Sequence, residues 1–243
     1  VIRLDSSRTI TTALIKANLT SSFFGEITPA ELTSISIINP DYLRTSQFDS
    51  QTLELSEVRP GFYEGSKQTI FFTEGELQLI IEHNNQSYLA KTRYVPSASI
   101  VSLEQGDGTL FSGNETEVQV TFTDDVQRED FYLVDLDFGD YLVTEDEFYN
   151  GQTFKFSYFY DDQVKPGREI NISLLGVDET FYNYMNQLIV QSGGDQGPFQ
   201  TPSATVRGNI INITDAENSS ESDNFALGYF AVCQTFTETI TIE

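Results

Sequence analysis

The chain is strongly acidic and poor in Cys and His. It has 243 residues with 37 acidic and 13 basic side chains, a formal net charge of −24, one Cys, one His and no Trp. The negative electrostatic field of such a chain repels phosphate backbones and anionic lipid head groups, which argues against nucleic acid as a partner. A single Cys forms no internal disulfide, so a disulfide-stabilised scaffold is excluded. Zinc and redox-metal sites need several Cys or His ligands, so such sites are excluded as well.

Alternating apolar and polar residues predict β-strands along most of the chain. In chain order, the clearest runs with a period of two lie at residues 33–37, 76–82, 117–123, 154–160 and 170–174. Turn-forming pairs such as Pro60-Gly61 and Asn150-Gly151 separate these runs. Strands with one buried and one exposed face are typical of antiparallel sheets, and their recurrence between turns favours β-sandwiches.

One amphipathic helix is predicted near residues 178–192. Asp178 can cap its first turn, because a carboxylate accepts hydrogen bonds from the free N–H groups there. The apolar residues that share one face at helical spacing are Phe181, Tyr184, Met185, Leu188 and Ile189. Gly193-Gly194 are expected to end the helix. We expect the apolar face to pack on a sheet, and a groove for a partner is the alternative.

The predicted fold class is all-β, with two domains. A boundary is expected near Pro96-Ser97, between two groups of strand-like runs. Residues 1–96 are predicted to form an immunoglobulin-like β-sandwich of about seven strands. Residues 97–243 are predicted to form a second β domain that carries the amphipathic helix near 178–192.

The sequence offers little for catalysis. His83 ends a strand-like run beside Asn84-Asn85, where a turn is expected, and nothing near it resembles a nucleophile elbow. Acidic pairs are abundant, but glycosidase chemistry needs two carboxylates at a defined separation in a cleft, which a sequence does not show. We therefore predict that the chain is not an enzyme. Cys233 lies in an apolar run and is predicted to be a core residue.

Two acidic clusters make calcium the one cofactor that the residues themselves suggest. The clusters are Asp135, Asp137 and Asp140, and Asp215, Glu217 and Asp223. Calcium takes about six to eight oxygen ligands, which acidic loops supply, but neither cluster matches an EF-hand. The alternative is that both are solvated loops. In that case Asp135 and Asp137 lie on the exposed face of a strand on which Phe138 faces inward.

The C-terminal part of the chain carries a distinctive motif. Residues 193–210 read Gly-Gly-Asp-Gln-Gly-Pro-Phe-Gln-Thr-Pro-Ser-Ala-Thr-Val-Arg-Gly-Asn-Ile, and residues 227–231 read Leu-Gly-Tyr-Phe-Ala. This pattern resembles the Bacteroidota lipoprotein family labelled domain of unknown function 4249. The motif positions are Pro198, Phe199, Gly208, Asn209, Gly228 and Tyr229. We interpret them as structural, because glycine permits turns and aromatic rings anchor strands.

The resemblance implies a location and a partner, and it assigns no activity, since none is established for the family. It implies an outer-membrane lipoprotein, lipid-anchored at the cell surface or the periplasmic face and often encoded beside a TonB-dependent transporter. The lipid-modified Cys would lie upstream of this chain, since Cys233 is near its other end. The leading hypothesis is a non-catalytic accessory subunit of a TonB-dependent transporter or another outer-membrane complex, whose partner is an outer-membrane β-barrel protein. The alternative is a surface lipoprotein that captures a nutrient, with or without calcium.

Overall fold

Two compact units make up the chain. The computed structural model describes residues 1–19, 27–43, 49–110, 113–160, 164–192, 205–214 and 226–243. Unit 1 consists of Val1–Tyr94 and Thr205–Val232, and unit 2 consists of Val95–Ala204 and Cys233–Glu243. Strands dominate the described residues, and the one long helix among them is α2 (Glu179–Ser192). The predicted all-β fold with one amphipathic helix is therefore confirmed.

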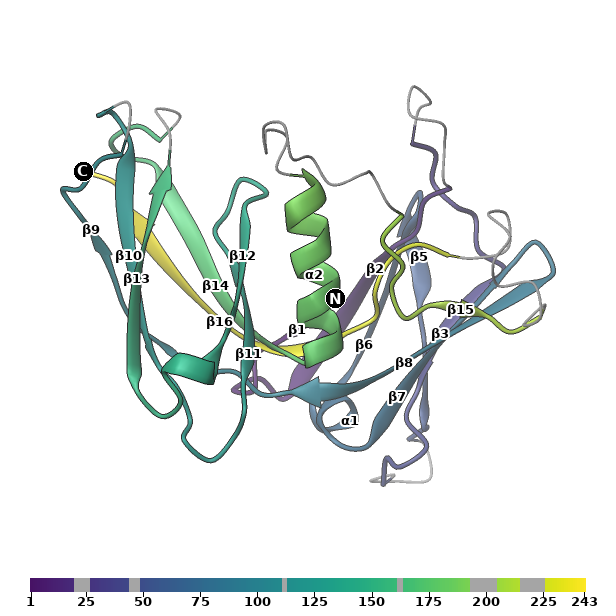
Figure 1. The fold of residues 1–243 in the computed structure, drawn as a ribbon. Coiled ribbons are helices and arrows are strands. Elements are labelled where there is room, and N and C mark those ends of the chain that lie inside the picture. Colours follow the sequence, from purple (N-terminus) through teal and green to yellow (C-terminus); the bar gives the residue numbers. More distant parts are fainter. Residues whose placement is uncertain (20–26, 44–48, 111–112, 161–163, 193–204, 215–225) are drawn as a thin grey trace. The chain divides into compact units, whose positions relative to one another are not determined.

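Unit 1 is a sandwich of two antiparallel sheets (Figure 1). One sheet has the order β2-β6-β5, and in the other β4, β3, β7 and β8 follow one another. The elements are β1 (Ile2–Leu4), β2 (Ile10–Lys16), β3 (Ser34–Ile38), β4 (Thr52–Glu54), β5 (Ser56–Arg59), β6 (Phe62–Gln68), α1 (Ile70–Thr73), β7 (Glu76–His83), β8 (Gln86–Val95) and β15 (Ile211–Asn212). Lettered B, C, C′, D, E, F and G in chain order, strands β2 to β8 form sheets B-E-D and C′-C-F-G, which is an immunoglobulin-like arrangement.

The core of unit 1 follows from strand alternation. Ile35 and Ile37 of β3 and Leu79 of β7 are buried from one sheet, and Ala13 and Tyr63 are buried from the other, in one hydrophobic cluster. Each of these strands turns its alternate side chains outward, as expected for a half-buried antiparallel sheet.

Unit 2 repeats this layout without a matching repeat in the sequence. One of its sheets has the order β13-β10-β9, and in the other β12, β11, β14 and β16 follow one another. The elements are β9 (Ile100–Gln105), β10 (Thr116–Thr123), β11 (Phe131–Asp135), β12 (Tyr141–Glu145), the 3-10 turn η1 (Asp146–Phe148), β13 (Thr153–Tyr160), β14 (Glu169–Val177), α2 and β16 (Val232–Thr241). Lettered A, B, C, C′, E, F and G, the strands read E-B-A and C′-C-F-G, which is again immunoglobulin-like. Val118, Val120 and Phe122 of β10 pack with Tyr132 and Ile172 in its core.

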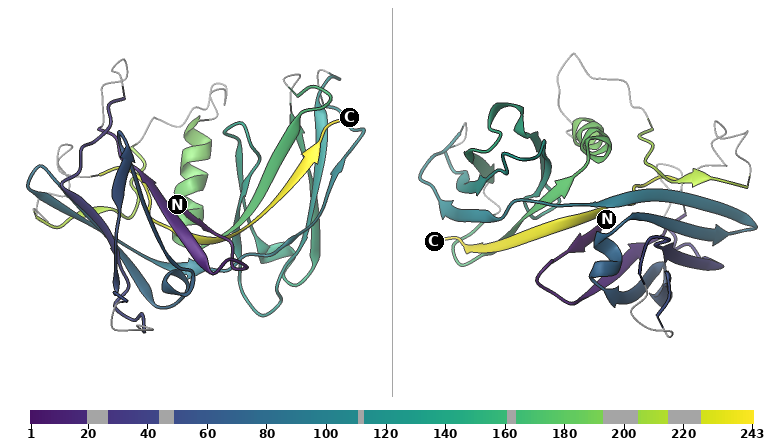
Figure 2. Two further views of the ribbon diagram at one scale, coloured as in Figure 1. Left: turned by 180° about the vertical axis from the view of Figure 1, so that it is seen from behind. Right: turned by 90° about the horizontal axis from the view of Figure 1, so that it is seen from below.

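Helix α2 covers the outer face of β11 and β12, as its apolar stripe predicts (Figures 1 and 2). The Oδ1 atom of Asp178 accepts a hydrogen bond of 2.7 Å from the backbone N–H of Phe181, so the predicted cap is present. Phe181 is buried, and the rings of Tyr182 and Phe131 lie 5.2 Å apart. The predicted glycine end, Gly193-Gly194, lies outside the described residues.

The segment Thr205–Val232 belongs to unit 1, although it follows α2 of unit 2 in the chain. Strand β15 pairs with β8, with Ile211 opposite Leu89, and Phe230 is buried in the core of unit 1. The boundary expected from the sequence, near Pro96-Ser97, assigns this segment to the second domain (residues 97–243) instead. Periodicity identifies a strand but not its partner, so a return of the chain across 100 residues leaves no local signal.

Candidate binding surface

The first acidic cluster does not converge on a common point. The Oδ1 atom of Asp135 accepts from the backbone N–H of Asp137, and the Oδ2 atom of Asp140 accepts from the hydroxyl of Tyr158. Partial burial acts to raise the pKa of Asp137, but backbone N–H donors from Asn171 and Phe138 hold that pKa below its ordinary value. Within the described residues, no group of three or more His, Cys, Asp or Glu side chains is arranged to hold a metal ion.

Several predicted positions lie outside the described residues: Asp215, Glu217, Asp223, Pro198 and Phe199. Among the described ones, His83 is part of the exposed end of β7, with Nδ1 2.9 Å from the carbonyl oxygen of Glu31. Cys233 is fully buried, as predicted for a core residue.

The four described motif positions meet in unit 1 and hold two backbone segments together. The Nδ2 atom of Asn209 donates to the carbonyl oxygens of Lys91 and Phe230, and its Oδ1 atom accepts from the N–H of Phe230. A Cβ atom on Gly208 would lie 1.6 Å from the carbonyl oxygen of Gly228, so only glycine fits there. Tyr229 lies directly beside this contact, between Gly228 and Phe230. The geometry gives Gly208, Asn209 and Gly228 a structural role.

An apolar surface, called the side face below, lies between the edge strands β12 and β13 of unit 2. It consists of Leu142, Phe154, Phe156 and Tyr158. Leu142 points to the inner side of its sheet, because its cross-strand neighbour Val134 is buried in the core. The three aromatic residues occupy alternate positions on β13 and pack only partly into the core. Leu142 keeps 37% of its surface exposed.

Polar contacts join β12 and β13 at both ends of the side face. At one end, the hydroxyl of Tyr158 donates to Asp140, over 2.9 Å. At the other end, the hydroxyls of Thr144 and Tyr149 are 2.9 Å apart, and the ring of Tyr149 stacks on Phe154 with centroids 4.2 Å apart. Since Asp140 and Thr144 flank Leu142 on the same side of β12, Leu142 faces the middle of the aromatic row.

Two strongly exposed aromatic residues flank the side face. Phe138 lies in the β11–β12 turn with 48% of its surface exposed, and Phe148 ends η1 with 84% exposed. The expectation that Phe138 faces inward is wrong. The strand ends at Asp135, and Asp137 and Phe138 adopt φ values of 67° and 52°, so the alternation of the strand does not continue through the turn. The ring of Phe138 instead lies near that of Tyr160, with centroids 6.0 Å apart.

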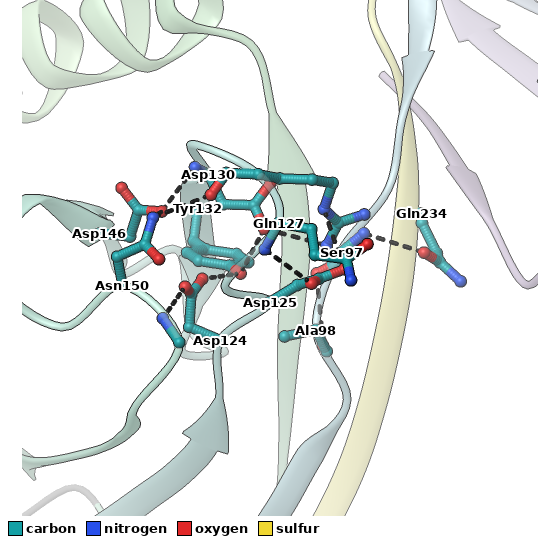
Figure 3. A network of polar contacts seen from close by, with 12 residues as sticks. Ser97, Ala98, Asp124, Asp125, Gln127, Asp130, Tyr132, Asp146, Asn150 and Gln234 are labelled. Atoms are coloured by element: carbon teal, nitrogen blue, oxygen red, sulfur yellow. Dashed lines mark hydrogen bonds and ion pairs between the residues drawn. The ribbon is translucent and has the colours of Figure 1, made fainter.

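A buried network of carboxylates fixes the backbone next to the side face (Figure 3). The hydroxyl of Tyr132 donates to Oδ1 of Asp124 over 2.6 Å and lies 3.1 Å from Oδ2 of Asp130. Arg128 forms an ion pair of 2.9 Å with Asp130. The backbone N–H of Asp130 donates to Oδ2 of Asp146, the first residue of η1. These bonds tie η1 to the loop that precedes β11.

Asn150 completes the attachment of η1. Its Nδ2 atom donates to the carbonyl oxygen of Arg128 and to Oδ2 of Asp146 (Figure 3). The backbone N–H of Tyr149 also donates to the carbonyl oxygen of Asp146. Phe148, between these anchored residues, is thus presented to solvent from a fixed backbone, which lowers the entropy that a partner must remove on binding.

Burial sets the pKa values in this network. Desolvation raises the pKa of Asp130, although the guanidinium of Arg128 acts in the opposite direction. Desolvation also raises the pKa of Tyr132 far above its ordinary range, and its hydrogen bond to Asp124 adds to the shift. The tyrosine hydroxyl therefore stays a neutral donor at physiological pH. We interpret these shifted groups as structural, since their polar atoms are already engaged with one another.

The exposed residues of the side face were missed by sequence reasoning. Leu142 of the side face lies in β12 (Tyr141–Glu145), and its exposed neighbour Phe148 ends the acidic turn η1 that follows. The available signal was the run Tyr-Leu-Val-Thr, which has high β propensity and directly precedes a cluster of charges.

The chain is thus a protein with two immunoglobulin-like sandwiches, and its unit 2 carries an apolar surface between the edge strands β12 and β13. A family model described as a domain of unknown function (DUF4249) matches residues 7–239, and the chain belongs to this family. The search of curated proteins found no match. No helix among the described residues is long and apolar enough to cross a membrane.

Proposed function

We propose that the chain is a non-catalytic accessory subunit of an outer-membrane complex and that it acts through protein–protein contact. The observation that carries the proposal is the side face with its exposed neighbours Phe138 and Phe148. Exposed aromatic residues on a fixed backbone are typical anchors of interfaces, and an apolar surface with a polar rim is the usual form of an interaction site.

The location and the class of partner rest on the family. The resemblance described above implies an outer-membrane lipoprotein, anchored at the surface or the periplasmic face and associated with a TonB-dependent transporter. We therefore propose an outer-membrane β-barrel protein as the partner, and a lipid anchor upstream of Val1. The separate unit 1, held together by the family motif, would then link the anchor to the unit that bears the side face.

The proposal is tested by affinity purification of the tagged full-length lipoprotein from native outer membranes in mild detergent, with partners identified by mass spectrometry. Among the described residues Phe148 is the most exposed aromatic side chain, and Phe148→Ser removes it; Val101→Ser on β9 is the matched control, because Val101 is also exposed (61%) and lies in unit 2. We expect a stoichiometric β-barrel protein with the wild type and with the control, and a strong loss with Phe148→Ser.

Two results would overturn the proposal. One is recovery of the protein alone even after gentle crosslinking, which would favour capture of a soluble ligand. The other is equal recovery of the β-barrel protein with Phe148→Ser and with the wild type, which would place the contact elsewhere.

A further inference from the structure

Strand β12 is an open edge of its sheet. It lies at the end of the order β12-β11-β14-β16, and among the described residues its only strand partner is β11. An open edge presents unpaired backbone N–H and C=O groups, which form a template for another strand. Helix α2 covers the outer face of β12 but is not a strand that could satisfy these groups.

The alternation of hydrogen-bonded pairs between β11 and β12 shows which backbone groups of β12 point toward the open edge. The N–H of Leu136 donates to the carbonyl of Asp140, and the N–H of Asp146 donates to the carbonyl of Asp130. Residues at even positions of β12 therefore exchange hydrogen bonds with β11, because hydrogen-bonded pairs alternate in an antiparallel ladder. The N–H and C=O groups of Tyr141, Val143 and Glu145 then point away from β11, toward the open edge.

Other edge strands in the described structure carry features that discourage pairing, and β12 does not. Strands β1, β4 and β15 have only two or three residues, β5 and β9 have register shifts in their pairing, and β2 and β13 carry the outward lysines Lys16 and Lys155. Short edges, bulges and lysines are the usual protections against unwanted strand addition. Strand β12 reads Tyr-Leu-Val-Thr-Glu, pairs with β11 in an unbroken register, and contains no Pro or Lys.

The charge around β12 selects a basic partner. Unit 2 holds 22 of the 37 acidic residues and 4 of the 13 basic ones, a formal charge of −18, whereas unit 1 carries −6. Asp140 precedes β12, Glu145 ends it, and Glu147 follows in η1. A second copy of the chain would bring the same negative charges to the edge, which disfavours pairing between copies.

We infer that β12 is a docking strand for an extended, basic segment of a partner polypeptide, which adds a strand to the sheet beside β12. This inference deepens the proposed function and rests on it for the biological partner. Side chains of the added strand that point inward would cover Leu142 and the aromatic row of β13, so they should be apolar. Those that point outward would lie near Tyr141, Val143 and Glu145, on the face that α2 covers in part, where a lysine or arginine can pair with Glu145.

The binding test uses the purified chain and synthetic peptides. The probe is a capped peptide of about eight residues, a typical strand length, that alternates Val and Lys. The control peptide has the same composition with the Val and Lys residues in two blocks, and a second control replaces Lys with Glu. We expect fluorescence anisotropy to show binding of the alternating peptide at least about tenfold tighter than of either control, because only it matches both faces of an added strand.

Val143→Pro is the decisive variant. Proline removes an N–H that points to the open edge and leaves the β11–β12 hydrogen bonds intact, so the fold should persist. We expect an affinity loss of roughly tenfold or more with unchanged circular dichroism, since an N–H donor is lost and the ring blocks close approach. A second variant, Glu145→Lys, should weaken binding several-fold and reduce its dependence on salt. When the alternating peptide is added, the backbone amide resonances of Tyr141, Val143 and Glu145 should shift most in NMR spectra.

Equal binding of the block-order peptide, or unchanged binding to Val143→Pro, would overturn the inference and indicate nonspecific attraction. A dimer of the chain that dissociates with Val143→Pro would also overturn it, because the occupant would then be a second copy. The outcome is separable from the proposed function. A β-barrel partner lost with Phe148→Ser but retained with Val143→Pro leaves the accessory-subunit proposal standing and removes only strand addition.

Discussion

Replacing Tyr132 with Phe should destabilise the chain, although it removes one oxygen atom from a fully buried ring. The ring packs edge-on against Phe122, with centroids 5.1 Å apart, and Phe retains that contact. The lost hydroxyl donates over 2.6 Å to the buried carboxylate of Asp124. A hydrogen bond to a charged group contributes about 1.5–3 kcal/mol, so we expect a loss of about 2 kcal/mol in the free energy of unfolding.

Tyr158→Phe is the matched control for this prediction. The same atomic change there removes a hydroxyl that donates to Asp140, an exposed carboxylate that water can solvate instead. Urea unfolding followed by circular dichroism should give a loss below about 1 kcal/mol for this variant. If the two variants lose equal stability, or if Tyr132→Phe loses less than the control, then burial of the carboxylate network does not matter and the argument for a fixed η1 fails.

Three further outcomes follow from described contacts. Asn209→Ala should lose about 2–3 kcal/mol in urea unfolding, because three backbone hydrogen bonds depend on that side chain, and no loss would leave the family motif unexplained. The pKa of Asp130 is raised in the folded state. The stability of the wild type relative to Asp130→Asn should therefore increase as pH falls through this pKa, and it should level off below the pKa of Asp130 in the unfolded chain. The opposite slope in pH-dependent melting would contradict this prediction. The melting temperature can be compared between excess calcium and excess chelator, for the wild type and for Asp137→Asn. The difference should be the same for both proteins, because the carboxylate of Asp137 already accepts two backbone N–H groups. A rise with calcium that is lost in the variant would place calcium at the β11–β12 turn.

The sequence predicted what depends on local periodicity. The alternation at residues 117–123 and 154–160 corresponds to the paired strands β10 and β13, and Asp178 caps α2 as expected. These features depend on neighbours in the chain and on which side of a strand or helix is apolar. The pairing of β15 with β8 depends on a contact between residues more than 100 positions apart, which local periodicity does not encode.

Acidic residues were the hardest to interpret from the sequence. Glu117 belongs to an alternating strand and is expected to be solvated, yet its side chain is buried, and hydrogen bonds from Ser157, Gln119 and the N–H of Gly108 hold its pKa below the ordinary value. A Cβ atom on Gly106 would lie 2.0 Å from its carboxylate, so the absence of a side chain at residue 106 leaves room for that of Glu117. Burial of a charge depends on donors supplied by distant segments, and composition alone points to the surface.

Residues of the side face are more exposed than the sequence predicts. Phe156 lies in the alternating run at residues 154–160, and Leu142 lies in the short apolar run Tyr141-Leu142-Val143, so both are expected to be buried. They remain partly exposed because β12 and β13 are the edges of two different sheets, which the sequence does not reveal. Edge position, and with it the candidate interface, is a property of strand order.

Contact between a protein partner and the side face of unit 2 can be tested in the native membrane. The most direct measurement is site-specific photocrosslinking in native outer membranes, with a photoreactive phenylalanine analogue placed at Phe148 or, as the control, at Val101. Both residues are exposed and lie in unit 2, so they differ in position rather than access. We expect a discrete adduct with an outer-membrane β-barrel protein from position 148 and none from position 101. An adduct from position 101 alone, or equal adducts from both positions, would contradict it.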